Sequence, residues 1–201
     1  MRKIARAVLV VITIGICISV GYFFGLSAHR EAPSGQSSSL QDNEELRQLY
    51  VDDQADRSPA DARAIDWSVV GARDRARQSR VKALFSQGGL QTADDYYHAA
   101  MILQHGDAPE DFLLAHEFCV VAIIKGKNDH ETRWLVASAE DRFLTRIGRP
   151  QRFATQFGVE GDGLWTLSPV DTSITDELRR LMGAHSLEEA RKHEAELNQK
   201  R

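Results

Sequence analysis

Cysteine is nearly absent from this sequence, which excludes the class of small proteins framed by disulfides. The 201 residues contain 2 cysteines, Cys17 and Cys119, and each lies within an apolar stretch. We therefore expect no disulfide within the chain and no reactive thiol. A domain without such cross-links depends on its hydrophobic core, and roughly 150 residues are enough to form one.

Proline is also sparse, with 5 residues, and the 14 glycines are far fewer than a collagen-like repeat requires, so that class is excluded. Hydrophobic residues make up 42% of the chain and charged residues 27%. This balance is unlike that of a wholly disordered chain. We expect one globular domain with an appendage.

Charge is missing from residues 7–28, a run of 22 positions near the N-terminus. A helix of that length spans about 33 Å, enough to cross the roughly 30 Å hydrocarbon core of a bilayer. The preceding basic segment 1–6 is typical of a short cytoplasmic tail. The sequence therefore predicts a single-pass signal anchor in the inner or cytoplasmic membrane, with the rest of the chain outside the cytoplasm.

A cleaved export signal is the alternative interpretation of the same segment. Such a signal ends in small residues spaced by one position, whereas Leu26, Ser27 and Ala28 place leucine where a small residue is preferred. A lipoprotein cleavage site is also a poor match, because Cys17 follows isoleucine. Anchor and export signal direct the body of the protein to the same compartment.

Nucleic acid is not an expected partner. Beyond residue 28 the chain has 22 basic and 29 acidic side chains, a net charge of −7, against −4 for the whole chain. An acidic body is a poor binder of polyanions. Its densest basic run has no aromatic platform and is interrupted by Asp74, so we interpret the run as a solvated helix face; its members are Arg73, Arg75, Arg77, Arg80 and Lys82.

Residues 29–43 are rich in Ser, Gln and Gly and predict a flexible linker, so the domain is expected to cover residues 44–201. Within it, a small polar residue is repeatedly followed three positions later by an acid, as at a helix N-terminus. These starts are Ser58, Thr92, Asn128, Ser173 and Ser186. Their number predicts a mainly α fold.

Apolar periodicity predicts a helix over 109–125 that packs against the helices expected over 93–105 and 129–147. Beyond Pro150 the pattern changes to two short strands around a glycine-rich turn, a small β-hairpin near 152–168. Two further helices are expected over 174–183 and 187–199.

The central helices resemble the tetratricopeptide type of helical pair over roughly one and a half units. Small residues at helix crossings and a glycine after each helix carry this resemblance. Solenoids normally need three or more repeats to bury a core. The resemblance therefore implies a helical bundle with tetratricopeptide-like pairs rather than an open solenoid.

A second resemblance covers most of residues 50–180. The chain is similar to a family of bacterial proteins of unknown function with widely spaced Asp-Gln, Gln-His, Asp-Arg and Gln…Gly-Thr-Gln signatures. Here the matching residues are Asp53, Gln54, Gln104, His105, Asp141, Arg142, Gln151, Thr155 and Gln156. Ala154 stands where that family has glycine, so a positive φ there would strain the turn. The resemblance implies that the pairs meet in space and supplies no activity.

Metal and cofactor chemistry are not favoured by the sequence. His98 and His105 are seven residues apart, about 10.5 Å along a helix, which is too far for two ligands of one zinc. His116 lies on an apolar stripe and is expected to be a hydrogen-bonded core histidine. No HExxH motif, paired-cysteine motif or G-x-S-x-G elbow occurs.

Two functions remain open. In the first, the domain is a module that binds a protein or envelope partner, and the signature residues are struts between helices. In the second, an enzyme, possibly a hydrolase, uses His105 as general acid or base with Asp141. Orientation or anion binding would then come from Arg142, and the pocket would be lined by Asp53, Gln54, Gln104, Gln151, Thr155 and Gln156.

Overall fold

The computed structural model describes residues 40–58, 65–159 and 163–199. All of them belong to one of the two units into which the chain divides, Ser39–Arg201. No helix in these three stretches is long and apolar enough to cross a membrane. The predicted anchor at 7–28 and most of the predicted linker lie outside the described residues.

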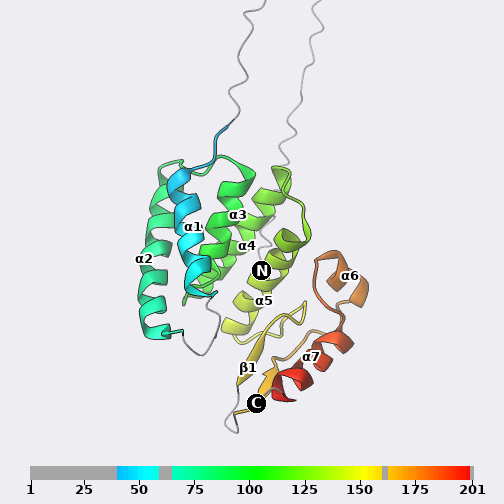
Figure 1. The fold of residues 1–201 in the computed structure, drawn as a ribbon. Coiled ribbons are helices and arrows are strands. Elements are labelled where there is room, and N and C mark those ends of the chain that lie inside the picture. The colour runs from blue at the N-terminus through cyan, green and yellow to red at the C-terminus, as the bar shows by residue number, and fades with distance from the viewer. Residues whose placement is uncertain (1–39, 59–64, 160–162, 200–201) are drawn as a thin grey trace, which may run out of the picture. The chain divides into compact units, whose positions relative to one another are not determined.

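The first five helices in the described residues form the larger part of the domain (Figure 1). Helices α1 (Glu44–Asp56) and α2 (Trp67–Ser86) lie side by side, and both contact α3 (Ala93–Leu103). Their N-termini are capped by the side chains of Asn43 and Asp66. The described part of the chain is therefore mainly α, as the sequence predicts.

Helix α4 (Pro109–Ile124) packs between α3 and α5 (His130–Arg146), which confirms the predicted order of the three helices. The main core lies among these helices and α1 and α2; its fully buried members include Leu46, Val81, Ile102, Leu103, Ala115, Cys119 and Leu135. Thr92 forms the expected capping box with Asp95. The cap expected at Asn128 is instead formed by Asp129, one residue later.

The chain beyond α5 forms a two-stranded antiparallel sheet and two more helices. Strand β1 (Phe157–Val159) pairs with β2 (Trp165–Leu167), which confirms a small sheet in the expected region. The expected first strand began too early, because residues 152–155 form an irregular loop. Helix α6 (Asp176–Leu181) is capped by Thr175 instead of Ser173.

Helix α7 (Leu187–Gln199) lies along β2. The Asn198 side chain bonds both the N–H and the carbonyl of Trp165, and Glu194 accepts from the N–H of Leu167. At the N-terminus of α7, Ser186 and Glu189 form the reciprocal capping contacts that the sequence predicts. Hydrogen bonds from side chains of α7 thus satisfy backbone groups along part of the edge of β2.

The basic run of α2 is a solvated face only in part, because Arg73, Arg75 and Lys82 are exposed whereas Arg77 is buried. Arg77 is 7% exposed and bonds the carboxylates of Asp56 and Asp74. Arg73 also bonds Asp56, and Arg80 bonds Glu45. The cations of α2 meet the acids of α1, a pairing between segments that spacing along one helix does not reveal.

Candidate functional site

The residues singled out from the sequence form two hydrogen-bonded networks. The first is centred on Asp53, which is fully buried near the end of α1. Its Oδ1 lies 3.1 Å from Nδ1 of His105 and accepts from Arg57 at 3.0 Å, while Oδ2 accepts from Gln54 at 2.8 Å. The network therefore links α1 to the turn that follows α3.

Arg57 extends this network to α2. Its second guanidinium nitrogen donates to Oδ2 of Asp74 at 2.6 Å, and Asp74 also accepts from Arg77. The three side chains are largely buried. Removing one member would leave a buried charge without its partner, so the network is a strong constraint on how α1, α2 and α3 pack.

The second network is centred on Asp141, also fully buried, on α5. Its carboxylate accepts from the backbone N–H groups of Arg152, Phe153 and Thr155 at 2.6–3.1 Å, and from the Thr155 hydroxyl at 2.8 Å. Burial raises the pKa of the Asp141 carboxyl, and these bonds oppose the rise. The contacts hold the loop after α5 against the helix.

Ala154 lies inside that loop with φ 60°, the left-handed region that favours glycine. The sequence analysis predicted strain at this position for a positive φ. Alanine in this conformation costs about 1–2 kcal/mol relative to an ordinary backbone. The bonds to Asp141 on both sides of Ala154 hold the strained residue in place.

The glutamines of the signature complete the second network. Gln151 bonds the backbone of Gln156 in both directions, at 2.8 and 2.9 Å, and donates to the carbonyl of Ser168. Gln156 in turn accepts from Arg142 at 3.2 Å. Gln151, fully buried, therefore anchors the loop to the strand region.

The two networks meet at Arg142, which donates to the carbonyl oxygen of Gln104, next to His105. The expectation that the separated pairs meet in space is thus confirmed by hydrogen bonds. Asp53 and Gln54 join His105, whereas Asp141 and Thr155 lie in the other network. The predicted set is therefore two adjoining clusters linked through one arginine.

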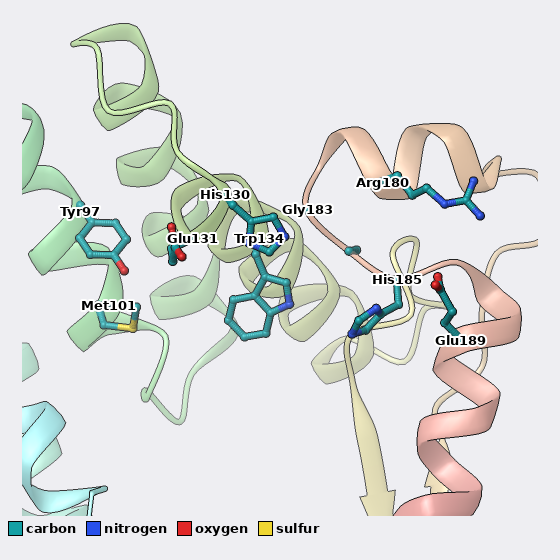
Figure 2. A pocket seen from close by; sticks show the side chains of 10 residues that line it. Tyr97, Met101, His130, Glu131, Trp134, Arg180, Gly183, His185 and Glu189 are labelled. Carbon is teal, nitrogen blue, oxygen red and sulfur yellow. The ribbon is translucent and has the colours of Figure 1, made fainter.

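A cleft lies elsewhere in the fold, between α5 and the segment that carries α6 and α7. It has a volume of about 550 Å³. Figure 2 shows the indole of Trp134 between Met101 of α3 and His185, which precedes α7. The other lining residues are Tyr97, His130, Glu131, Arg180, Gly183, Ala184 and Glu189.

The walls of this cleft combine apolar surface with a few polar groups. Trp134 is 36% exposed, whereas Tyr97 is 9% exposed. Burial raises the pKa of the Tyr97 phenol above its usual range, so its hydroxyl stays protonated and can donate a hydrogen bond. Arg180 directs its guanidinium away from the indole (Figure 2).

Sequence reasoning missed the cleft, although one signal was present. The signal is Trp134, a large aromatic residue within the helix expected over 129–147, but its exposure depends on where α6 and α7 lie. Gly183 sets that position: its φ is +73°, and a Cβ there would lie 3.0 Å from the carbonyl oxygen of His130. Periodicity along α5 carries no information about so distant a neighbour.

The described histidines and carboxylates contain no cluster of three or more that could hold a metal ion. His98 stacks on Tyr50 with ring centroids 4.3 Å apart, and burial lowers its pKa. Nδ1 of His116 lies 3.1 Å from the carbonyl oxygen of Val136, which is the expected hydrogen bond, although the residue is half-buried rather than in the core. Cys119 is fully buried, and burial raises the pKa of its thiol.

Comparison with known proteins adds nothing to this geometry: no protein family, curated protein or solved structure matches the chain.

Proposed function

We propose that the chain is a membrane-anchored binding module whose helical domain works outside the cytoplasm and holds a protein partner of the cell envelope in the cleft beside Trp134. The anchor is residues 7–28, and residues 29–43 are the tether. In this proposal the two polar networks are struts that hold the helices in place.

The observation that carries the proposal is the exposed indole inside a cleft of about 550 Å³. Trp, Tyr, Met and Arg are enriched at protein interfaces, and tryptophan is prominent among the residues that dominate binding energy. Trp134, Tyr97 and Met101 supply this chemistry here. The helical pairs that present them are, in this proposal, of the tetratricopeptide type.

A photoreactive residue placed at position 134 in the full-length chain tests the cleft in living cells. We expect a discrete crosslinked protein adduct from position 134. Position 67 is the matched control, because Trp67 is 62% exposed and does not line the cleft. The same adducts from both positions, or none from position 134, would contradict the proposal.

The membrane arrangement is tested by fusing to the C-terminus a reporter enzyme that becomes active only outside the cytoplasm. We expect an active reporter in the membrane fraction, resistant to extraction by alkaline carbonate. An inactive reporter would contradict the topology. An active reporter released to the soluble fraction would instead support a cleaved signal.

One observation favours a second candidate, an enzyme. His105 is oriented through Nδ1 by the buried carboxylate of Asp53, which is how a carboxylate orients a general base. Asp141 is less suited to proton transfer, since its oxygens already accept from the loop. The enzyme hypothesis therefore depends on His105 and Asp53.

A panel of chromogenic esters, amides and glycosides tests this candidate with the full-length chain. Turnover that disappears in His105→Ala and persists in His98→Ala would support the enzyme. Turnover that is unchanged by His105→Ala would exclude His105 as the general base. Thermal unfolding of both variants shows whether the substitution also removes a strut.

A further inference from the structure

The guanidinium group of Arg142 has no acidic partner among the described residues. Its Nε donates to Gln156 at 3.2 Å and another nitrogen donates to the carbonyl oxygen of Gln104, and both acceptors are neutral. Among the ion pairs of the described residues, none includes Arg142. A partly buried cation without a counter-ion is costly, so such groups are normally paired.

Arg146 lies one turn further along α5 and is also without an ion pair in the described part of the chain. The guanidinium carbons of Arg142 and Arg146 are 5.8 and 5.7 Å from the ring centroid of Phe112. Both cations therefore share one aromatic ring of α4. Stacking orients the two guanidinium groups without neutralising either charge.

The central acids of the two networks, and Glu140 on the same helix, are already engaged. Asp141 accepts from the loop backbone, Glu140 pairs with Arg152, and Asp53 pairs with Arg57 and His105. Burial lowers the pKa of Arg142, and repulsion from Arg146 and Arg57 adds to the effect. An anion at this place would relieve both the missing pairing and the repulsion between like charges.

We propose that Arg142 and Arg146 form a binding site for a small oxyanion, a phosphate or carboxylate group, over the ring of Phe112. Guanidinium groups bind such groups through two parallel hydrogen bonds. The acidic net charge of the domain disfavours extended polyanions and leaves a single oxyanion as the fitting ligand. This site is separate from the cleft beside Trp134.

The test measures thermal unfolding of the full-length chain in non-ionic detergent micelles, with phosphate, acetate or chloride at equal ionic strength. A ligand that binds only the folded state raises the melting temperature, and we expect a rise of about 2–5 °C with phosphate or acetate over chloride. Arg146→Gln should remove most of that rise. Because Arg146 is exposed, this variant is expected to fold.

Arg149→Gln is the matched control, an exposed arginine three residues away that should keep the full rise. A second arm replaces micelles by nanodiscs of phosphatidylglycerol or phosphatidylcholine. Protection by phosphatidylglycerol that depends on Arg146 identifies a lipid headgroup as the source of the oxyanion, and protection by free phosphate or acetate identifies a soluble one. An equal rise in Arg146→Gln and Arg149→Gln, or equal melting temperatures in all anions and lipids, would overturn the site.

Discussion

At the scale of single residues, one carboxylate organises the loop that joins the helical bundle to the sheet. Asp141 accepts from four donor groups within residues 152–155, three backbone N–H groups and the Thr155 hydroxyl, and Ala154 keeps a strained φ between them. Backbone strain persists only where neighbouring contacts over-determine it. The hydrogen bonds to Asp141 therefore maintain the strained backbone conformation of Ala154.

Asp141→Asn is expected to destabilise the domain by about 1–3 kcal/mol. Whichever way the amide is turned, its NH2 group faces a backbone N–H that the carboxylate accepts from in the native protein. Urea unfolding of the full-length chain measures the effect. Asp52→Asn, an exposed change on α1, is the control and should stay within about 0.5 kcal/mol of the native protein. Equal stability of the two variants would show that Asp141 does not anchor the loop.

Ala154→Gly is expected to change stability by less than about 1 kcal/mol, because opposing effects are similar in size. Glycine removes about 1–2 kcal/mol of strain at φ 60° and loses about 0.5–1 kcal/mol through chain entropy, together with the burial of one methyl group. Ala154→Val should instead lower stability by more than about 1 kcal/mol, because a β-branched residue is disfavoured at this φ and the site is buried. Denaturant midpoints of the two variants compare them directly, and a valine variant as stable as the glycine variant would contradict the strain argument.

Much of the polar site could be predicted from the sequence, since Asp53 with His105 and Arg142 with Gln156 do meet. The structural role of each residue in these contacts could not be predicted from the sequence. The same Asp-Arg signature produces a loop anchor in Asp141 and a cation without an acid in Arg142, because only the fold decides which donors reach each side chain. Asp141 and Arg142 therefore have different structural roles, although both belong to the same Asp-Arg signature.

At the scale of elements, the boundaries of helices depend on which side chain reaches the free N–H groups. Thr92 and Ser186 cap as their spacing predicts, whereas Asp129 and Thr175 replace the expected Asn128 and Ser173. Each replacement lies within two residues and is an equally good cap chemically. Periodicity predicts that these helices exist, and tertiary packing selects the residue at which each begins.

The placement of α6 and α7 beside α5 depends on Gly183. Gly183→Ala should be more destabilising than Gly148→Ala, by about 1 kcal/mol or more. Both glycines follow a helix with φ +73°, but only at Gly183 would a Cβ crowd the backbone of His130 and Trp134. The difference between the variants therefore isolates crowding from backbone strain.

The same pair of variants tests the cleft. Because crowding at Gly183 pushes α6 and α7 away from α5, the fluorescence emission of Trp134 should shift to longer wavelength in Gly183→Ala and stay unchanged in Gly148→Ala. A Trp134→Phe background identifies the contribution of this indole among the 3 tryptophans. Identical spectra and stabilities in the two variants would show that Gly183 does not set the cleft.

At the scale of the whole molecule, ion pairs join separate elements as well as residues of one helix. The cations of α2 face the acids of α1, so a domain with an acidic net charge still buries Arg77 and Asp74. A count of charges along the sequence identifies the acidic balance of the body. It could not identify the bridges between the α1 segment and α2, because their partners lie 17 to 35 residues apart.

These pairs and the helix caps predict that the domain loses stability in acid. Hydrogen bonds hold the pKa of eight carboxyls below their ordinary values of 3.8 or 4.5; they are Glu44, Glu45, Asp56, Asp66, Asp129, Asp171, Asp176 and Glu189. The unfolded chain then binds more protons than the folded one as these groups titrate. Stability should therefore be fully present near pH 6 and should fall as the pH drops from about 5 to 3, against a contribution of opposite sign from Asp141.

Arg77→Met separates this linkage from a general effect of acid. The bond from Arg77 is the largest cause of the lowered pKa of Asp56, so without it the pKa of that carboxyl falls less on folding. The variant should be less stable than the native protein at pH 7 and should lose less further stability between pH 5 and 3. Arg75→Met, an exposed change on the same helix, should reproduce the native slope. Melting temperatures of the three proteins across this range provide the measurement, and parallel curves for Arg77→Met and the native protein would show that the pairing between α1 and α2 does not control acid stability.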